Sequence, residues 1–283
     1  MSPFLIAMRA ELFVALRQRR LWLLLLLPTV AAIIRLLLIR INVASANLQQ
    51  SLSGRTPSEN VDFAYGYLVD GLLTGLVFIY ILFMAMAAFS FSSDRDQGTV
   101  RHLIIRQSSR LQVLAAKALV LHGQAIIACI CLFVITFLLS AIFWDFGPVI
   151  EDGYELISVA EIHDELRTGI ILALLPLPAC LCLGVFFSVV TNSALQAVSV
   201  AVGISLLLDI FKGALGSKAN FLYLNFQPSL LDNSYLHEVS RIVRGFSDVL
   251  IDEQVMQFNY WLPIPQAIIF LIVALVLVRR KNL

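Results

Sequence analysis

Six long apolar runs dominate the sequence, and each is long enough, or nearly long enough, to cross a lipid bilayer as a helix. A hydrocarbon core of about 30 Å takes about 20 apolar residues in helical form, because lipid cannot hydrogen-bond exposed backbone groups. Of the 283 residues, 59% are hydrophobic and 14% are charged, whereas soluble domains average about 25% charged residues. The sequence therefore predicts an all-α integral membrane protein with six transmembrane helices. The runs are Leu21–Ile39, Leu72–Phe91, Leu114–Phe143, Ile170–Val190, Ala194–Phe211 and Trp261–Val278.

The distribution of charge predicts how these spans are oriented. If the N-terminus is cytoplasmic and the spans alternate in direction, the cytoplasmic segments hold 12 of the 20 Lys and Arg residues but three of the 19 Asp and Glu residues. Positively charged residues collect on the cytoplasmic side of membrane proteins. We therefore expect both termini in the cytoplasm. Outer loops are expected at Asn42–Val69 and Glu151–Glu165, and a long outer segment at residues 213–260.

The start of the chain admits two interpretations. Basic residues followed by the apolar stretch Leu21–Leu27 are also typical of a cleaved signal peptide. The apolar run continues to Ile39, which is beyond the usual length of such a region, and no clear cleavage site follows it. We therefore expect an uncleaved first span and a single domain over residues 1–283.

Two segments outside the spans have the spacing of amphipathic helices. Residues 1–20 predict an elbow helix on the cytoplasmic surface, with an apolar stripe toward the membrane and arginines near anionic headgroups. In the outer segment, Ser234–Ile251 predicts a helix that lies at the outer interface or dips part-way into the membrane. The stripe of the elbow helix comprises Phe4, Leu5, Met8, Leu12, Ala15 and Leu16, and its arginines are Arg9, Arg17, Arg19 and Arg20.

The largest cytoplasmic loop, residues 92–113, has features of a docking surface. Gly98 ends the incoming helix, Thr99 can cap a short new helix, and Ser108 or Ser109 can cap the third span. The short helix carries the apolar residues Leu103, Ile104 and Ile105. Three consecutive apolar residues in a cytoplasmic loop favour a protein contact, and an ordinary solvated loop is the alternative.

This order of segments resembles the permease subunits of type-2 ABC exporters. An amphipathic helix, a span, an outer loop, a span and a basic cytoplasmic loop are followed by four more spans, with a long outer segment before the last. Members of that family tend to have an acidic residue, a Gly-Thr step, a Pro-x-Ser-Arg-like turn and a lysine at similar spacing. The matching residues are Asp94, Asp96, Gly98, Thr99, Ser109, Arg110 and Lys117, with Gln107 where proline is frequent in the family.

The resemblance implies a mechanism and partners. Two permease chains, identical or related, would form a pathway above two ATPase subunits in the bacterial cytoplasmic (inner) membrane. The loop near Gly98–Ile105 would fit a groove on the ATPase, residues 1–20 would press against it, and Ser234–Ile251, including Phe246, would help to form an outer gate. Residues implied in coupling to the ATPase are Asp94, Asp96, Gly98, Thr99, Leu103, Ile104, Arg110 and Lys117.

Ionisable and helix-bending residues inside the spans are further candidates for a pathway or gate. Arg35 lies about one turn from the outer end of the first span, where it can snorkel outward or contact an anionic substrate or lipid headgroup. Asp209 and Lys212 stand three residues apart on one helix, so a local ion pair is expected. Pro176 and Pro178 should bend the fourth span.

Catalytic, metal and nucleotide sites are not expected in this chain. No phosphate-loop motif G-x-x-x-x-G-K-[S/T] is present, so ATP and magnesium are expected on the partner ATPase. An intramembrane enzyme would need paired carboxylates or a nucleophile with a base, and the spans are nearly free of acids. The four cysteines form two pairs, and the members of each pair are two residues apart, which places them on different sides of a helix. This spacing favours a role in apolar packing. The cysteines are Cys129, Cys131, Cys180 and Cys182.

The leading interpretation is a permease subunit of an ABC exporter that works with a separate ATPase. The alternatives are a non-transporting membrane anchor or assembly protein and, less favoured, an intramembrane enzyme. Expected partners are an ABC ATPase subunit, a second permease copy or paralogue, and membrane lipid, but no nucleic acid. The substrate stays open among a lipid, a glycolipid and a hydrophobic peptide.

Overall fold

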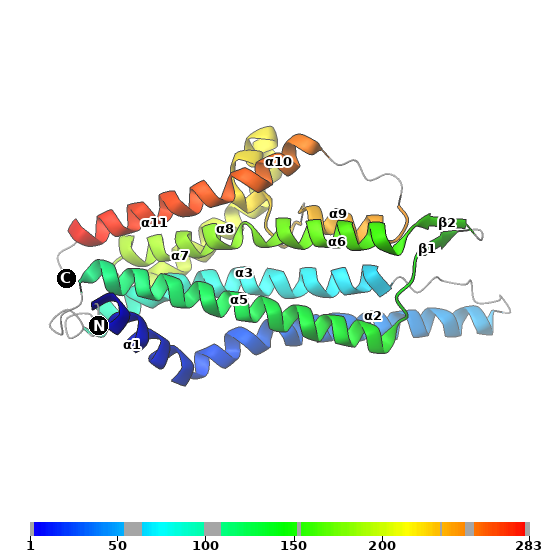
Figure 1. Ribbon diagram of the computed structural model, residues 1–283, viewed down its shortest axis with the longest axis horizontal. Helices are drawn as coiled ribbons and strands as arrows, with labels where there is room; N and C mark the ends of the chain where they lie inside the picture. Colours follow the sequence, from blue (N-terminus) through cyan, green and yellow to red (C-terminus); the bar gives the residue numbers. More distant parts are fainter. Residues whose placement is uncertain are drawn as a thin grey trace.

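The computed structural model describes residues 3–53, 64–98, 109–151, 154–232, 234–246 and 252–280. Within these residues, six helical segments are long and apolar enough to cross a membrane, which confirms the predicted all-α membrane fold. They form an elongated bundle, and both ends of the chain lie at the same end of it (Figure 1). We call this the terminal end, and we call the opposite end, which carries a short β-hairpin, the distal end.

The helices cross the bundle in alternating directions. The first three crossings are α2 (Arg19–Leu52), α3 (Ala64–Asp96) and α5 (Arg110–Phe143), and α1 (Pro3–Arg17) precedes them. The fourth combines α6 (Val159–Leu174) with α7 (Leu177–Val190), the fifth is α8 (Ala194–Leu215), and the sixth combines α10 (Glu253–Trp261) with α11 (Pro263–Arg280). Between crossings lie β1 (Val149–Glu151), β2 (Tyr154–Ile157), two 3-10 turns (Gly216–Phe221 and Tyr223–Asn225) and α9 (Tyr235–Ile242).

Several helices extend past the apolar runs that predict them. α2 continues to Leu52 and α3 begins at Ala64, so part of the expected loop Asn42–Val69 is helical. α6 begins at Val159, inside the expected acidic loop, because Ser158 and Glu161 form a capping box that starts the helix. Hydropathy predicts the part of a helix that lies in lipid, whereas capping and backbone hydrogen bonds determine where the helix begins and ends.

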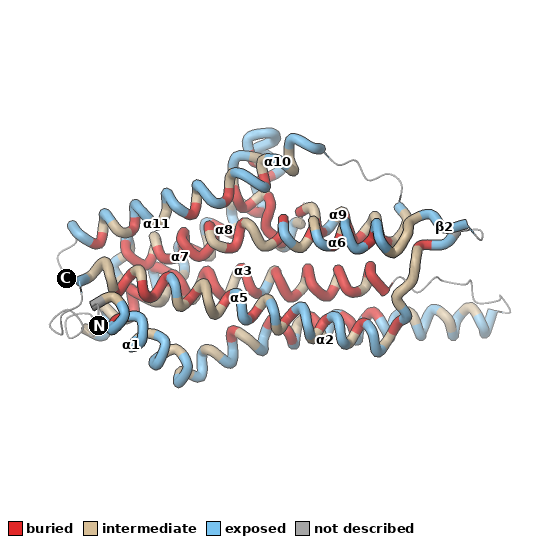
Figure 2. Tube along the Cα trace, in the orientation of Figure 1, coloured by how far each residue is buried: buried red, intermediate tan, exposed pale blue. Residues whose placement is uncertain are grey.

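α3 is the central helix of the bundle and is buried along most of its length (Figure 2). It packs against α2, α5, α7, α8 and α9. Glycines bring the neighbouring helices close, since a Cβ added at Gly75 would lie 2.3 Å from Leu132 of α5. A Cβ added at Gly184 of α7 would lie 2.7 Å from the carbonyl oxygen of Met84. Small residues serve the same purpose in membrane helix pairs generally, because lipid provides little hydrophobic drive for association.

Pro176 and Pro178 break the fourth crossing between α6 and α7, which confirms the predicted bend. Proline has no N–H, so Pro176 cannot donate to the carbonyl of Leu172. That carbonyl accepts instead from Nδ2 of Asn259 at 3.2 Å, and the neighbouring carbonyl of Ala173 accepts from the hydroxyl of Tyr80 at 2.7 Å. Side chains of α10 and α3 thus satisfy backbone groups that lipid could not.

Replacing Tyr80 with phenylalanine is expected to lower the free energy of unfolding by about 1–3 kcal/mol, because the buried carbonyl of Ala173 then lacks its donor. Thermal unfolding of the detergent-purified protein measures this loss. Tyr154→Phe is the matched control, since Tyr154 is exposed. Equal unfolding temperatures for the two variants would show that this hydrogen bond contributes nothing.

The predicted outer amphipathic helix is present but shorter than expected. α9 ends at Ile242 instead of Ile251, because Gly245 takes a left-handed φ of 80° and the N–H of Phe246 bonds back to the carbonyl of Arg241. Residues 247–251 lie outside the described part of the chain. α9 packs against both α3 and α6, with Leu236 fully buried. One face of α9 therefore packs on the bundle in its distal half, and the other face, with His237, is exposed.

Candidate functional site

The Lys117 ammonium group joins three helices at the terminal end. Its Nζ lies 2.8 Å from Oε2 of Glu11 on α1 and 2.7 Å from Oδ2 of Asp94 on α3. The Lys117 side chain, on α5, is 10% exposed. We call this group the Lys117 triad. It ties the elbow helix and the end of the central helix to a long helix with an apolar outer face.

Local sequence places each member of the triad. Ser109 accepts from the N–H of Gln112 while the Gln112 side chain accepts from the N–H of Ser109, and this capping box fixes the start of α5 about two turns before Lys117. The prediction that Ser108 or Ser109 caps this span is confirmed for Ser109. Gly98 has a left-handed φ of 71°, which terminates α3 at Asp96, two residues after Asp94.

The Lys117 triad combines two acidic groups with one basic group. Two carboxylates share one ammonium group in a place that is largely screened from solvent. Desolvation raises the pKa of Glu11 above its ordinary value of 4.5, and the attraction of Lys117 only partly offsets this rise. Lys117 therefore favours the ionised form of Glu11 against the effect of burial.

A cavity of about 430 Å³ lies beside the triad, between α1, α2, α3 and α5. Glu11, Asp94 and Lys117 line one part of it, and apolar side chains such as Leu24 and Leu121 line another. α1 packs against α5 at the border of this space, and the triad adds a charged contact between them.

The structure changes the interpretation of the elbow helix. Ala7, Glu11 and Ala15 form the face of α1 that turns toward the bundle. The predicted stripe residues Leu5, Met8, Leu12 and Leu16 are exposed and turn away from the protein. This apolar outer face still suits the membrane interface. All four arginines are exposed: Arg9, Arg17, Arg19 and Arg20, the last with its guanidinium 4.4 Å from the centre of the Phe89 ring.

The other predicted coupling residues are placed separately from the triad. Asp96 accepts from the N–H of Ala194 at 2.7 Å, so it links the end of α3 to the start of α8. Arg110 is the first residue of α5. Thr99, Leu103 and Ile104 lie outside the described residues. The sequence interpretation missed Glu11 as a partner of Lys117, although an acid on the inward face of an otherwise basic helix was a usable signal.

A second charged group stands at the distal end, around Asp70 of α3. Its Oδ2 lies 2.8 Å from Arg244, and its Oδ1 accepts from the hydroxyl of Ser240 at 2.8 Å, which together hold α9 against α3. Arg35 of α2 approaches the same carboxylate at 3.5 Å, with its side chain 48% exposed. Arg35 therefore pairs with an acid of the same chain, a contact that neither of its two predicted roles included. Gly66 makes room for Arg244, since a Cβ there would lie 2.7 Å from Nε.

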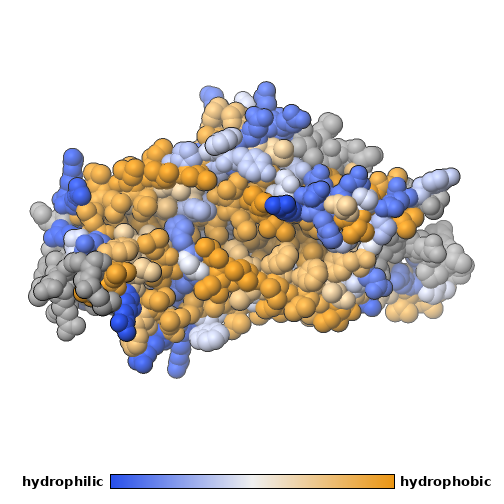
Figure 3. Space-filling model, in the orientation of Figure 1, coloured by the Kyte–Doolittle hydropathy of each residue, from blue (hydrophilic) through white to orange (hydrophobic). Residues whose placement is uncertain are grey.

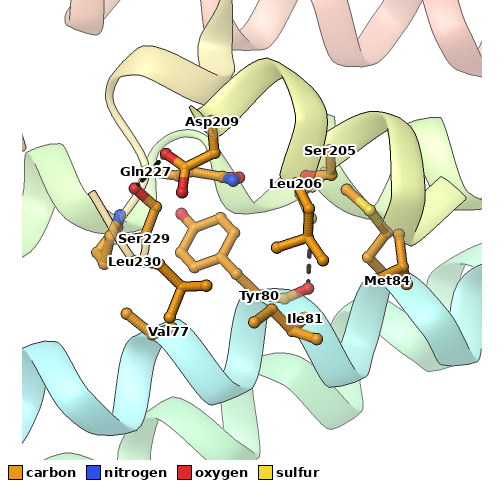
Figure 4. A pocket seen from close by; sticks show the side chains of 13 residues that line it. Val77, Tyr80, Ile81, Met84, Ser205, Leu206, Asp209, Gln227, Ser229 and Leu230 are labelled. Carbon is orange, nitrogen blue, oxygen red and sulfur yellow. Dashed lines mark hydrogen bonds between the residues drawn. The ribbon is translucent and has the colours of Figure 1, made fainter. Parts of the chain in front are cut away.

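The predicted ion pair of Asp209 and Lys212 is confirmed. Nζ of Lys212 lies 2.9 Å from Oδ1 of Asp209, and the two side chains are 7% and 4% exposed. Ser229 donates to the same carboxylate oxygen at 2.6 Å (Figure 4). Asp209 and Ser229 line a cavity of about 20 Å³, room for about one water molecule. Phe246, by contrast, is exposed and lies apart from this pair, beside Arg241.

Metal and thiol chemistry find no support within the described residues. That part of the chain holds no cluster of three or more His, Cys, Asp and Glu side chains that could bind a metal ion. The cysteines at positions 129, 131, 180 and 182 are free thiols, and those at 180 and 182 are buried.

Comparisons with known proteins place the chain in a family. Neither the curated proteins nor the solved structures gave a match. Residues 29–281 match the family model described as "Protein of unknown function (DUF2705)", and the chain belongs to that family.

Proposed function

We propose that this protein is the membrane-spanning permease subunit of an ABC transporter of the exporter type, driven by a separate ATPase. The observation that carries the proposal is the Lys117 triad, because it connects α1, α3 and α5 at the end where an ATPase would act. The terminal end is then cytoplasmic, in line with the excess of Lys and Arg in the segments at that end. No enzymatic activity is assigned to the chain itself.

The geometry suits the transmission of force across the membrane. Residues 99–108 connect α3 to α5, and a push on this connection would reach both helices, which the triad couples. α3 then runs from Asp94 to Asp70, about 36 Å at 1.5 Å per residue. At its distal end it is tied to α9 through Arg244. A movement of the triad can therefore reach the distal helix that would form the gate.

The proposal implies partners that the chain must recruit. A partner ATPase would bind ATP and magnesium and contact the terminal end, and a second permease chain, identical or related, would complete the pathway. The cavity beneath α1 gives the elbow helix space to shift when the ATPase closes. An assembly anchor would share this topology but would have no use for a charged tie between the moving elements.

Purification of the tagged, full-length protein from its native membrane in mild detergent tests the proposal. We expect an ATPase with a phosphate loop to co-purify in equal amount. In Gly98→Val its amount should fall several-fold, because a β-branched residue is strained at the left-handed φ beside the connection. Gly123→Val is the matched control, since Gly123 has open space around its Cβ position and an ordinary backbone.

Two results would contradict the proposal. If the protein purifies without any nucleotide-binding chain, the permease function falls and a membrane anchor is the better interpretation. If Gly98→Val and Gly123→Val retain the ATPase equally, the end of α3 is not part of the contact.

A further inference from the structure

An apolar groove opens sideways between α5 and α6 in the distal half of the bundle, with α3 as its floor. We call it the α5–α6 groove, and its volume is about 570 Å³, within the range of ligand-binding cavities. Leu72 and Leu76 contribute from α3, Phe133 and Phe137 from α5, and Leu166 and Ile170 from α6. The surface between α5 and α6 is largely apolar (Figure 3).

The fold itself keeps this groove open. α6 packs mainly on α9, and Gly169 allows the approach, since a Cβ there would lie 3.0 Å from Leu236 and from Val239. α9 in turn packs on α3. α5 packs on α2 and α3 instead of on α6. The groove is therefore a built feature that faces the surrounding lipid.

Polar groups gather at one end of the groove. Tyr65 and His163 share a hydrogen bond of 3.0 Å between the phenol oxygen and Nε2. Arg167, one turn along α6, lines the groove, is exposed, and forms no ion pair or hydrogen bond with any described residue. Asp164 stands three residues earlier on the same helix, and no ion pair joins these two described residues. A guanidinium at the mouth of an apolar groove, with no partner among the described residues, is suited to an anionic oxygen group such as phosphate.

The length of the groove matches one leaflet of a bilayer. The floor of the groove follows α3 from Tyr65 to Leu76, a length of about 16 Å at 1.5 Å per residue. The hydrocarbon core of a bilayer is about 30 Å thick, so half of it is about 15 Å. With the apolar end near Leu76 at mid-membrane, Tyr65 and His163 lie at the depth of lipid headgroups. Arg167 lies about 6 Å deeper along α6 and reaches that depth by snorkelling, because helix side chains tilt toward the N-terminus.

We propose that the α5–α6 groove binds a glycerophospholipid of the distal leaflet, with one acyl chain along α3 and the phosphate at Arg167. The apolar lining fits the chain, and the cation at headgroup depth complements the phosphate that all such lipids carry. Tyr65 and His163 add hydrogen-bonding groups to the same end. The site stands apart from the Lys117 triad, so it does not require that the protein be a transporter.

Photocrosslinking of the full chain in lipid nanodiscs tests the site. The probe is a phosphatidylethanolamine with a diazirine near the end of one acyl chain, and a diacylglycerol with the same chain is run in parallel. We expect phospholipid adducts to concentrate on α5 and α6 between Ile130 and Phe137 and between Arg167 and Leu174. Arg167→Gln should weaken phospholipid labelling about tenfold, to the level of the diacylglycerol.

Matched variants separate the groove from the general lipid surface. Ile170→Trp fills the groove and should abolish the adducts, whereas Ile126→Trp, at an exposed position of α5 outside the groove, should not. Arg40→Gln is the control for Arg167→Gln, because Arg40 is exposed near the distal end of α2, away from the groove. Arg167→Gln changes a surface side chain, so it reports on the site even if Ile170→Trp fails to fold.

Three outcomes would overturn the proposal. Adducts spread evenly over all spans, or unchanged by Ile170→Trp, would show ordinary lipid contact. Equal labelling by the diacylglycerol would show that the groove does not recognise the phosphate. Crosslinks from groove residues to a second copy of the chain would show that a protein surface, and not a lipid, occupies the groove.

Discussion

Lys117→Met is expected to lower the free energy of unfolding by about 3–5 kcal/mol. The substitution keeps the length of the side chain but removes the ammonium group that Glu11 and Asp94 share, so the largely buried carboxylate of Glu11 loses its ion pair beside a second carboxylate. SDS titration of the purified protein, followed by circular dichroism, measures the loss. Arg17→Met is the matched control, because Arg17 is an exposed cation on α1 whose guanidinium lies over the Phe13 ring, outside the triad.

The pH dependence of the same variant has a defined sign. Burial already raises the pKa of Glu11 above 4.5 in the folded protein, and removal of Lys117 raises it further. A carboxyl group with a raised pKa binds its proton more tightly when folded, so the folded state gains stability as the pH falls toward 4.5. Lys117→Met should therefore be least stable near neutral pH and regain stability on acidification. A loss of stability that does not change with pH would contradict the electrostatic explanation.

A triple variant separates stability from coupling. Lys117→Met combined with Glu11→Gln and Asp94→Asn removes all three charges, and it should regain most of the lost stability because the buried carboxylate of Glu11 is removed together with its cation. If the triad transmits movement from an ATPase, this stable variant should nevertheless fail to couple. Stability that stays as low as that of Lys117→Met alone would show that the three groups do not act as one unit.

Gly184→Val is expected to have the second large effect, a loss of about 3 kcal/mol or more. A Cβ at Gly184 would lie 2.7 Å from the carbonyl oxygen of Met84 and 2.7 Å from Cβ of Ala87, so α7 would have to move away from α3. A backbone carbonyl inside the central helix cannot rotate aside as a flexible side chain can.

Gly203→Val is the control for this substitution. Gly203 lies within α8, and a Cβ there would have no neighbour within 4 Å, so a change within about 0.5 kcal/mol is expected. Thermal unfolding of both variants in the same detergent makes the comparison. Similar losses at the two sites would show that the α3–α7 contact is looser than its geometry indicates.

Composition and local chemistry were enough to predict the spans and several of their details. Six spans could be identified because lipid imposes a length and a polarity on every crossing helix. The break at Pro176, the pair of Asp209 and Lys212, and the cap at Ser109 each depend on residues that are close together in the sequence, so spacing was enough to find them.

The long-range partnerships could not be read from the sequence. Glu11 and Lys117 are 106 positions apart, and Asp70 and Arg244 are 174 positions apart. Glu11 lies in the predicted surface helix and Asp70 just before the second apolar run, where acids resemble ordinary interfacial residues. The helical parts of the expected loops were missed for a related reason, since polar turns of a helix outside the membrane carry no hydropathy signal.

The broken backbone of the fourth crossing has a consequence for biogenesis. The carbonyl of Leu172 depends on Asn259, which lies 87 residues later and enters the membrane with the final crossing. While the first five crossings are in the membrane and the sixth is not, the carbonyl of Leu172 therefore lies in hydrocarbon without a donor. The final crossing supplies this hydrogen bond through Asn259. A chain truncated before Asn259 would keep the unpaired carbonyl, a defect that membrane quality control would recognise.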